Sequence, residues 1–296
     1  MNVAYDGPRI DAHLHVWERT ASDYAWLGSG DELFADFPAE RAALELAASG
    51  IGHAILVQAD DTRRDTRYLL DVAEHNDWVA GVVGWIPLVD PARGIAQLDE
   101  LGSRPALVGI REMIHVKADR GYLAQRAVRD SLKVVARRTL TFDIPDAWPL
   151  HLHAVPALAD ALPDLTIVVD HLGKPPGSPE EFAMWRNLMA DCALRPNVVT
   201  KFSGLSDYSS TRGPDATRVL LEIALAEFGS SRICWGSDWP ISTKSANYAS
   251  TWSSAAGLVS ELSRSEQGDL LFRAAARAYR VNPSTTTLEP HLLETP

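Results

Sequence analysis

Ionisable side chains recur in this sequence at the points where short apolar runs end. They are His13 and His15, followed by Arg111, Asp143, His171, Lys201 and Asp238. Residues so far apart in a chain come together when the apolar runs are parallel strands whose carboxyl ends meet at one end of a barrel. The pattern therefore predicts one reactive site at that end.

His13 and His15 form a His-x-His pair at the end of the first run. Residues two apart in a strand face the same way, so both imidazoles can point at one ion, although a structural role is also compatible with the pair alone. His171 and Asp238 end the sixth and eighth runs. Three imidazoles and a carboxylate are a ligand set typical of zinc or a related divalent ion.

Arg111 and Lys201 also end apolar runs, where an unpaired charge would be costly. Each therefore needs an anionic partner. In an enzyme this partner is a substrate carboxylate or an oxygen that gains charge in the transition state. The alternative is an internal ion pair, for instance with Asp143.

Three further polar or aromatic residues are candidates for substrate contact. Trp85 and Trp239 offer flat apolar faces for a sugar ring, but both also suit the filling of a barrel. Gln58 ends the second run, where it contacts substrate hydroxyls or simply caps the strand.

The elements that must position these residues alternate along the chain. We expect eight strands, at Pro8–Ala12, His53–Ala59, Val79–Ile86, Ala106–Arg111, Leu140–Ile144, Leu165–Asp170, Asn197–Ser203 and Arg232–Gly236. Amphipathic segments between them predict helices, for example at Ala39–Ser49, Arg64–Asn76 and Tyr122–Arg138, with Gly50 and Pro196 at helix ends. Nearly continuous apolar strands indicate burial on both faces. This favours a closed parallel α/β barrel over an open doubly wound sheet.

The 296 residues, 46% of them hydrophobic, suit one barrel domain over 1–296. The segment 17–37 is too long for an ordinary connection and is either part of the pocket wall or a packed surface excursion. The tail 282–296 has little capacity to form a core.

The net charge of −11 disfavours nucleic acid and anionic membranes as partners. Cys192 and Cys234 are interpreted as packing residues, and no secretory signal or membrane-span pattern is present. We expect a cytoplasmic protein with a small-molecule substrate, with a homo-oligomer possible.

Other histidines are interpreted as structural or solvent-facing. His151 and His153 form a second His-x-His, but they lie where the fifth helix is expected to begin, and residues two apart in a helix diverge. The remaining four are His53, His75, His115 and His291.

The chain resembles the amidohydrolase superfamily, and within it the branch of sugar-lactone lactonases and related metal-dependent hydrolases. The residues that carry the resemblance are 10–17, 81–85, 107–111, 140–143, 170–175, 201–205 and 236–240. The resemblance implies a (β/α)8 TIM barrel, a site at the carboxyl ends of the strands, and usually one divalent metal, with some relatives using none. Arg111 and Asp143 stand where binuclear members carry a carboxylated lysine and a histidine, so a binuclear centre is not expected.

Together these features predict a carboxylic ester hydrolase that opens a small polar lactone from sugar-acid or muconolactone catabolism. His13, His15, His171 and Asp238 would hold the metal, with Asp238 alternatively acting on the water proton, and His171 and Lys201 would assist catalysis. Two alternatives remain open: a metal-dependent carboxy-lyase of an aromatic or unsaturated acid, and a non-catalytic sugar-acid-binding barrel.

Overall fold

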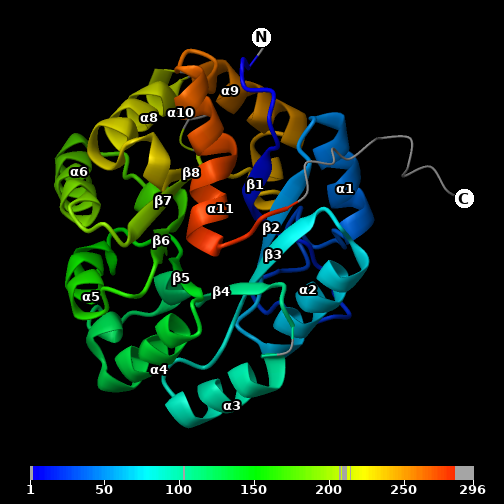
Figure 1. Cartoon of the computed structure of the whole chain (residues 1–296), viewed down its shortest axis with the longest axis vertical. Coiled ribbons are helices and arrows are strands. Elements are labelled where there is room, and N and C mark those ends of the chain that lie inside the picture. The colour runs from blue at the N-terminus through cyan, green and yellow to red at the C-terminus, as the bar shows by residue number, and fades with distance from the viewer. Residues whose placement is uncertain (1–2, 103, 207, 209–211, 214, 284–296) are drawn as a thin grey trace, which may run out of the picture.

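Eight parallel strands form a ring in the computed structural model of the chain, with helices around it (Figure 1). The structure describes residues 3–102, 104–206, 208, 212–213 and 215–283. The strands are β1 (Ile10–Leu14), β2 (His53–Val57), β3 (Val79–Gly84), β4 (Leu107–Arg111), β5 (Thr141–Ile144), β6 (Ile167–Val169), β7 (Val198–Phe202) and β8 (Ile233–Trp235). Each pairs with the next in chain order, which confirms the predicted parallel barrel.

The ring closes between β8 and β1 through residues just beyond the end of β8. The Trp239 carbonyl accepts a hydrogen bond of 2.7 Å from the His15 amide, and the His13 carbonyl accepts one of 2.8 Å from the Asp238 amide. The same backbone contacts that close the barrel therefore bring Asp238 beside the His-x-His pair.

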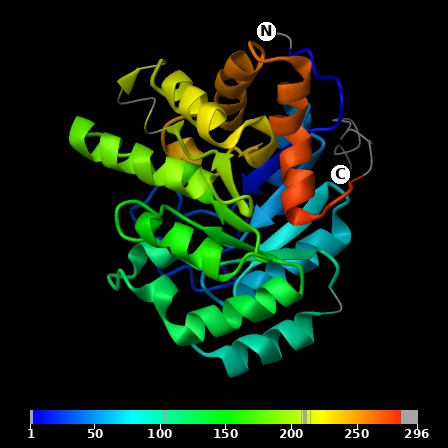
Figure 2. The ribbon, with the colours of Figure 1, turned by 60° about the vertical axis from the view of Figure 1, so that its left-hand side comes forward.

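Helices cover the outside of the ring, as a turned view also shows (Figure 2). They are α1 (Ala39–Ala48), α2 (Arg63–His75), α3 (Pro91–Leu101), α4 (Arg126–Arg137), α5 (Val155–Ala161), α6 (Pro179–Ala193), α8 (Asp215–Phe228), α9 (Tyr248–Val259), α10 (Arg264–Gly268) and α11 (Ala274–Tyr279). Their starts follow capping chemistry: the Thr62 side chain accepts the Asp65 amide at α2, and Ser178 accepts the Glu181 amide at α6. Among the described residues, no helix has the length and apolarity that a membrane crossing requires.

One predicted helix is divided. Tyr122–Ala124 is a short 3-10 turn, and α4 begins only at Arg126. Gln125 between them has an extended backbone with ψ of 135°, so the expected continuous helix Tyr122–Arg138 was wrong at its start. The amphipathic pattern extended across this break because the side chains of Tyr122 and Leu123 are buried like those of the helix.

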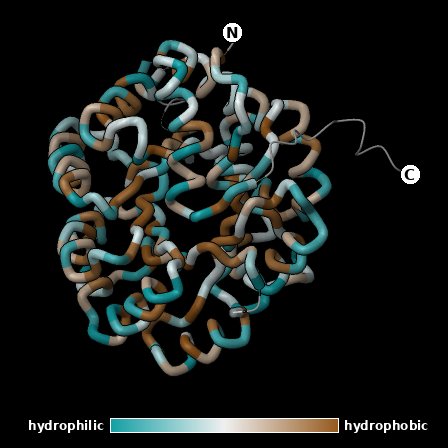
Figure 3. The backbone as a smooth tube through the Cα atoms, in the orientation of Figure 1, coloured by the Kyte–Doolittle hydropathy of each residue, from teal (hydrophilic) through white to brown (hydrophobic). Residues whose placement is uncertain are grey.

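Apolar residues line the ring and the inner faces of its helices, whereas hydrophilic residues lie toward the outside (Figure 3). Inside the ring, residues near the strand starts, such as Ile10, Val108 and Val199, form a cluster with Ala278 and Tyr279 of α11. Helix α11 crosses the ring in Figure 1 and covers this end of the barrel. The polar site lies beyond the cluster, toward the strand ends.

The segment 17–37 folds back on itself and onto the loop after β2. Trp17 and Phe37 exchange backbone hydrogen bonds of 3.0 and 2.8 Å, and the Tyr24 hydroxyl donates to Asp65 at 2.8 Å. The Trp26 indole donates to the Ala59 carbonyl. These contacts hold the segment against the barrel. Most of the tail 282–296, including His291, lies outside the described residues.

Cys192 and Cys234 are both buried and unbonded to one another, as expected for packing residues. Burial raises the pKa of each thiol to about 12. Both therefore remain protonated at neutral pH.

Candidate metal centre and active site

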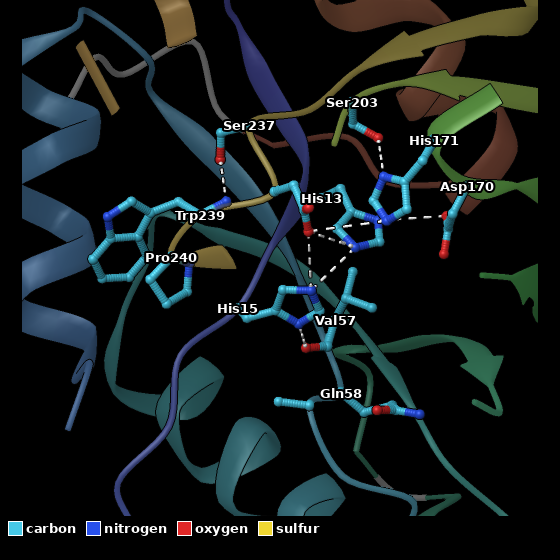
Figure 4. A network of polar contacts seen from close by, with 12 residues as sticks. His13, His15, Val57, Gln58, Asp170, His171, Ser203, Ser237, Trp239 and Pro240 are labelled. Carbon is cyan, nitrogen blue, oxygen red and sulfur yellow. Dashed lines mark hydrogen bonds and ion pairs between the residues drawn. The ribbon is translucent and has the colours of Figure 1, made fainter. Parts of the chain in front are cut away.

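Three imidazoles and one carboxylate converge at the carboxyl ends of β1, β6 and β8 (Figure 4). The Oδ1 atom of Asp238 lies 3.6 Å from Nε2 of His13, 3.5 Å from Nε2 of His15 and 3.9 Å from Nε2 of His171. The Nε2 atoms of His13 and His15 are 3.1 Å apart. The structure thus brings together the four residues expected to hold a metal.

His15 is held with one nitrogen free for a ligand. Its Nδ1 lies 2.8 Å from the Val57 carbonyl oxygen, which can only accept, so Nδ1 carries the proton and Nε2 keeps a lone pair. Burial lowers the pKa of this imidazole, which keeps it neutral. A neutral imidazole with its second nitrogen anchored in this way is a typical metal ligand.

His171 follows β6 in a left-handed turn. His171 and Leu172 have φ of 55° and 52°, so the chain turns sharply after the strand instead of extending to Asp170 as predicted. The His171 Nδ1 lies 2.9 Å from the Ser203 hydroxyl oxygen. Asp238 also has a positive φ, of 58°. Non-glycine residues in this region are uncommon and cluster at functional sites, because surrounding contacts must offset the strain.

The side chains fit a divalent ion. One ligand atom each from His13, His171 and Asp238 lies within 4.8 Å of the others, and His15 contacts two of these three. Zinc bonds of about 2.0 Å in a tetrahedron place neighbouring ligand atoms about 3.3 Å apart. The three distances among His13, His15 and Asp238, 3.1 to 3.6 Å, are close to that spacing, and His171 lies 3.9 Å from Asp238. Nitrogen and carboxylate donors are also the set that zinc prefers.

A second layer of buried charges lies behind His13. Lys201, with an exposed fraction of 0%, pairs with Asp143 at 2.8 Å and Asp170 at 3.0 Å. Its Nζ also lies 3.1 Å from Nδ1 of His13. Arg111 pairs with Asp170 at 3.3 Å and donates to the Gln58 carbonyl. The internal ion pair with Asp143, left open by the sequence, is therefore present.

Two of the expected site residues lie in this second layer. Asp143 is fully buried and bonded to Lys201, Thr141 and Tyr279. Lys201 reaches the centre through His13. Both therefore have buried protein partners.

Lys201 and Asp170 stabilise each other in their charged forms, whereas burial raises the pKa of Asp143. Burial opposes ionisation of Asp170, but Lys201 and His13 hold the pKa of this carboxyl well below its usual range. Burial likewise disfavours the charge on Lys201, but Asp143 and Asp170 together raise its pKa. Lys201 is consequently an ammonium ion at neutral pH.

The proposed substrate-contact residues lie in different environments. Gln58 is fully buried and donates to Asp61 at 2.8 Å. Trp239 is also fully buried, with Phe37 at 5.5 Å in an edge-on ring contact, so it fills the space under segment 17–37. Trp85 at the end of β3 is only half-buried. Of these three, Trp85 alone is partly exposed.

The histidines outside the centre, apart from His115, lie in buried or exposed positions that fit the expected roles. His151 is buried and its Nε2 lies 3.1 Å from the Lys117 carbonyl, whereas His153 is exposed, so this pair does not share a ligand. His53 is buried in β2, and His75 is exposed at the end of α2. These positions fit structural or solvent-facing roles.

His115 is the exception. Its Nδ1 is buried without a hydrogen-bond partner among the described residues. Burial and the charge of Arg111 lower its pKa to about 4, and the charge of His171 contributes to the shift. His115 lies four residues past Arg111, within a short 3-10 turn. Asp170, which directly precedes His171 at a strand end, was not among the residues that the sequence singled out.

Gly204 controls the position of His171. It has φ of +61°, and a Cβ atom there would lie 2.5 Å from Nδ1 of His171. We expect Gly204→Ala to displace this imidazole and reduce turnover about a hundredfold, since shifts of about 1 Å cost that much. Gly229→Ala is the matched control, because Gly229 has φ of +67° with nothing within 4 Å. Both variants carry the backbone strain, so equal turnover in steady-state assays would contradict the assigned role of Gly204.

The fold and the site define a TIM-barrel protein with a histidine and carboxylate centre suited to a divalent ion. The chain belongs to the amidohydrolase family, whose pattern matches residues 10–281. It is 36% identical over 243 residues to an L-fucono-1,5-lactonase from Burkholderia ambifaria, covering 81% of this chain and 83% of that protein. An L-fucono-1,5-lactonase from Burkholderia multivorans is 31% identical over 291 residues, which are 92% of this chain and 95% of that one.

A solved structure of an amidohydrolase from Burkholderia multivorans with bound zinc has a similar fold. Its TM-score is 0.83 at 30% sequence identity, and the match covers 93% of this chain and 100% of that chain. This similarity and the convergence of His13, His171 and Asp238 both support a divalent metal in this family member.

Proposed function

We propose that this protein is a zinc-dependent hydrolase that opens an uncharged lactone of a sugar acid. The observation that carries the proposal is the convergence of Nε2 of His13, His15 and His171 on Oδ1 of Asp238. Similarity to two L-fucono-1,5-lactonases supports the lactone as the bond that is broken.

A bound divalent ion polarises an ester carbonyl and makes water a better nucleophile at neutral pH. His13, His15 and His171 would hold that ion through imidazole nitrogens. Water adds to the lactone carbonyl carbon, and the bond from this carbon to the ring oxygen breaks. Asp238 takes the proton of the water and passes it to the ring oxygen, which leaves as a hydroxyl. The product is a hydroxy acid, which ionises and releases one proton.

The charge pairing near the centre favours an uncharged substrate. Lys201 pairs with Asp143 at 2.8 Å, and Arg111 pairs with Asp170 at 3.3 Å. A substrate carboxylate would have to compete with a protein carboxylate for each of these cations. Breaking such a buried pair is strongly destabilising, by about 3–5 kcal/mol. The cations therefore stabilise the site and do not recruit an acidic substrate.

The same pairing disfavours the carboxy-lyase alternative, because a decarboxylase must bind a substrate carboxylate. A non-catalytic sugar-acid-binding barrel has no need for a metal centre beside a carboxylate suited to proton transfer. The hydrolase accounts for both features.

The proposal includes a cytoplasmic location and one catalytic domain. Buried, unpaired Cys192 and Cys234 fit a reducing compartment. A small-molecule substrate fits a site at the end of a barrel. The possible homo-oligomer stays a prediction.

A substrate panel tests the proposed bond and charge. We expect acid release, followed with a pH indicator, from neutral sugar-acid lactones at a kcat/KM at least about tenfold above that for carboxylated muconolactones, which corresponds to roughly 1.4 kcal/mol. Aromatic acids should release no carbon dioxide. Preference for carboxylated lactones would contradict the charge argument, and carbon dioxide release without ring opening would favour the carboxy-lyase.

A further inference from the structure

The C-terminal helix reaches the metal-facing histidines through a buried chain of contacts. Tyr279 of α11 donates its hydroxyl to Oδ2 of Asp143 at 2.5 Å. Lys201 donates to the same oxygen at 2.8 Å, and its Nζ lies 5.4 Å from the centre of the Tyr279 ring. All three side chains are buried. Tyr279 therefore constrains Lys201 from the closed end of the barrel.

Lys201 and Asp170 both face the same nitrogen of His13. The Lys201 Nζ lies 3.1 Å from Nδ1 of His13, and Oδ1 of Asp170 lies 3.4 Å from it. An ammonium group can only donate a hydrogen bond, and an ionised carboxylate can only accept one. If Lys201 donates a hydrogen bond to Nδ1 of His13, the His13 proton must lie on Nε2. If Asp170 accepts a hydrogen bond from Nδ1, the proton lies on Nδ1.

Only the second tautomer allows Nε2 of His13 to hold a metal, because a ligand nitrogen needs its lone pair. With the proton on Nε2, His13 instead donates to Nε2 of His15 at 3.1 Å. Metal binding at Nε2 of His13 would therefore require its proton to lie on Nδ1. Lys201 must then direct its N–H bonds to Asp143 and Asp170, so that Nδ1 of His13 can donate to Asp170.

We propose that Tyr279 is a positioning residue that makes the metal-binding tautomer of His13 accessible. The Tyr279 hydroxyl fixes Asp143, and Asp143 holds the Lys201 ammonium. Lys201 then makes no hydrogen bond to Nδ1 of His13, and Nδ1 can donate to Asp170. The inference rests on the proposed metal site. It gives the C-terminal helix a role in metal affinity in addition to closing the barrel.

The test is the zinc affinity of Tyr279→Phe, which removes one hydroxyl and keeps the ring. We expect zinc binding about tenfold weaker than in the unmodified protein, measured by competition with a chromophoric chelator, since outer partners of metal ligands alter affinity by about 10–100-fold. Tyr24→Phe is the matched control, because the buried Tyr24 hydroxyl donates to the buried carboxylate of Asp65 at 2.8 Å. Its zinc affinity should stay within about twofold of the original.

A double-variant cycle separates positioning from a general loss of stability. Because Tyr279 acts through Asp143, combining Tyr279→Phe with Asp143→Asn should weaken zinc binding no further than Asp143→Asn alone. Equal affinities for Tyr279→Phe and Tyr24→Phe, or additive losses in the cycle, would overturn the inference while leaving the proposed function intact. If Asp143→Asn does not fold, the zinc affinities of Tyr279→Phe and Tyr24→Phe alone test the inference. An unmodified protein that binds neither zinc nor another divalent ion overturns both proposals.

Discussion

Asp238→Asn is expected to reduce turnover of a neutral sugar-acid lactone by about a thousandfold or more. The substitution removes the group that carries the proton from water to the ring oxygen, and general acid-base catalysis contributes about 10²–10⁴-fold. It also weakens a ligand that lies 3.5 to 3.9 Å from three imidazole nitrogens. Asn suits the test because it tolerates the left-handed backbone of this position, where φ is 58°.

Steady-state kinetics of acid release should show the loss mainly in kcat. Asp99→Asn is a suitable control, because it makes the same chemical change at an exposed position. Asp99 forms an ion pair with Arg138 and contacts none of His13, His15 and His171 in the ion pairs that the structure shows. Substantial activity in Asp238→Asn, with thermal stability equal to that of the control, would remove Asp238 from the proposed mechanism.

Removal of metal is expected to abolish turnover, and zinc is expected to restore it with about one ion bound per chain. Buried His13 and His15 are poised for this exchange, because burial lowers the pKa of both imidazoles and leaves their neutral, ligand-competent forms at neutral pH. Elemental analysis before and after dialysis against a chelator measures the metal content, and acid release measures the recovery.

A mock dialysis without chelator is the control for loss of folded protein. Full turnover after verified metal removal would show a metal-independent enzyme, in which the same imidazoles bind the lactone carbonyl directly. Recovery with another divalent ion but not with zinc would correct the identity of the metal alone.

The partners of the buried charges illustrate what lies outside sequence reasoning. Lys201 was recognisable as a charge at a strand end, and Asp143 as one option for its partner. Asp170 and Tyr279 were not, because their contacts with Lys201 join β6, β7 and α11 across the barrel interior. Nothing in the local pattern of any of these segments specifies which facing side chain comes within hydrogen-bond distance.

The local backbone geometry of some residues also could not be predicted from the sequence. The left-handed residues His171 and Asp238 follow strands that were predicted, but the turns themselves depend on contacts with Ser203 and the backbone of His13. Gln125 interrupts a segment that has a continuous amphipathic pattern. Such a break is hard to predict from the sequence, because the pattern of buried apolar residues continues across it.

The sequence by itself determined the parallel barrel and the placement of His13, His15, His171 and Asp238 at strand ends, because apolar runs specify buried strands and parallel strands direct their carboxyl ends to one side. The tertiary structure alone decided which nitrogen of each imidazole faces Asp238 and which charges neutralise one another behind His13. Those features depend on distances of a few ångströms between segments remote in the chain, and these distances exist only once the barrel has closed.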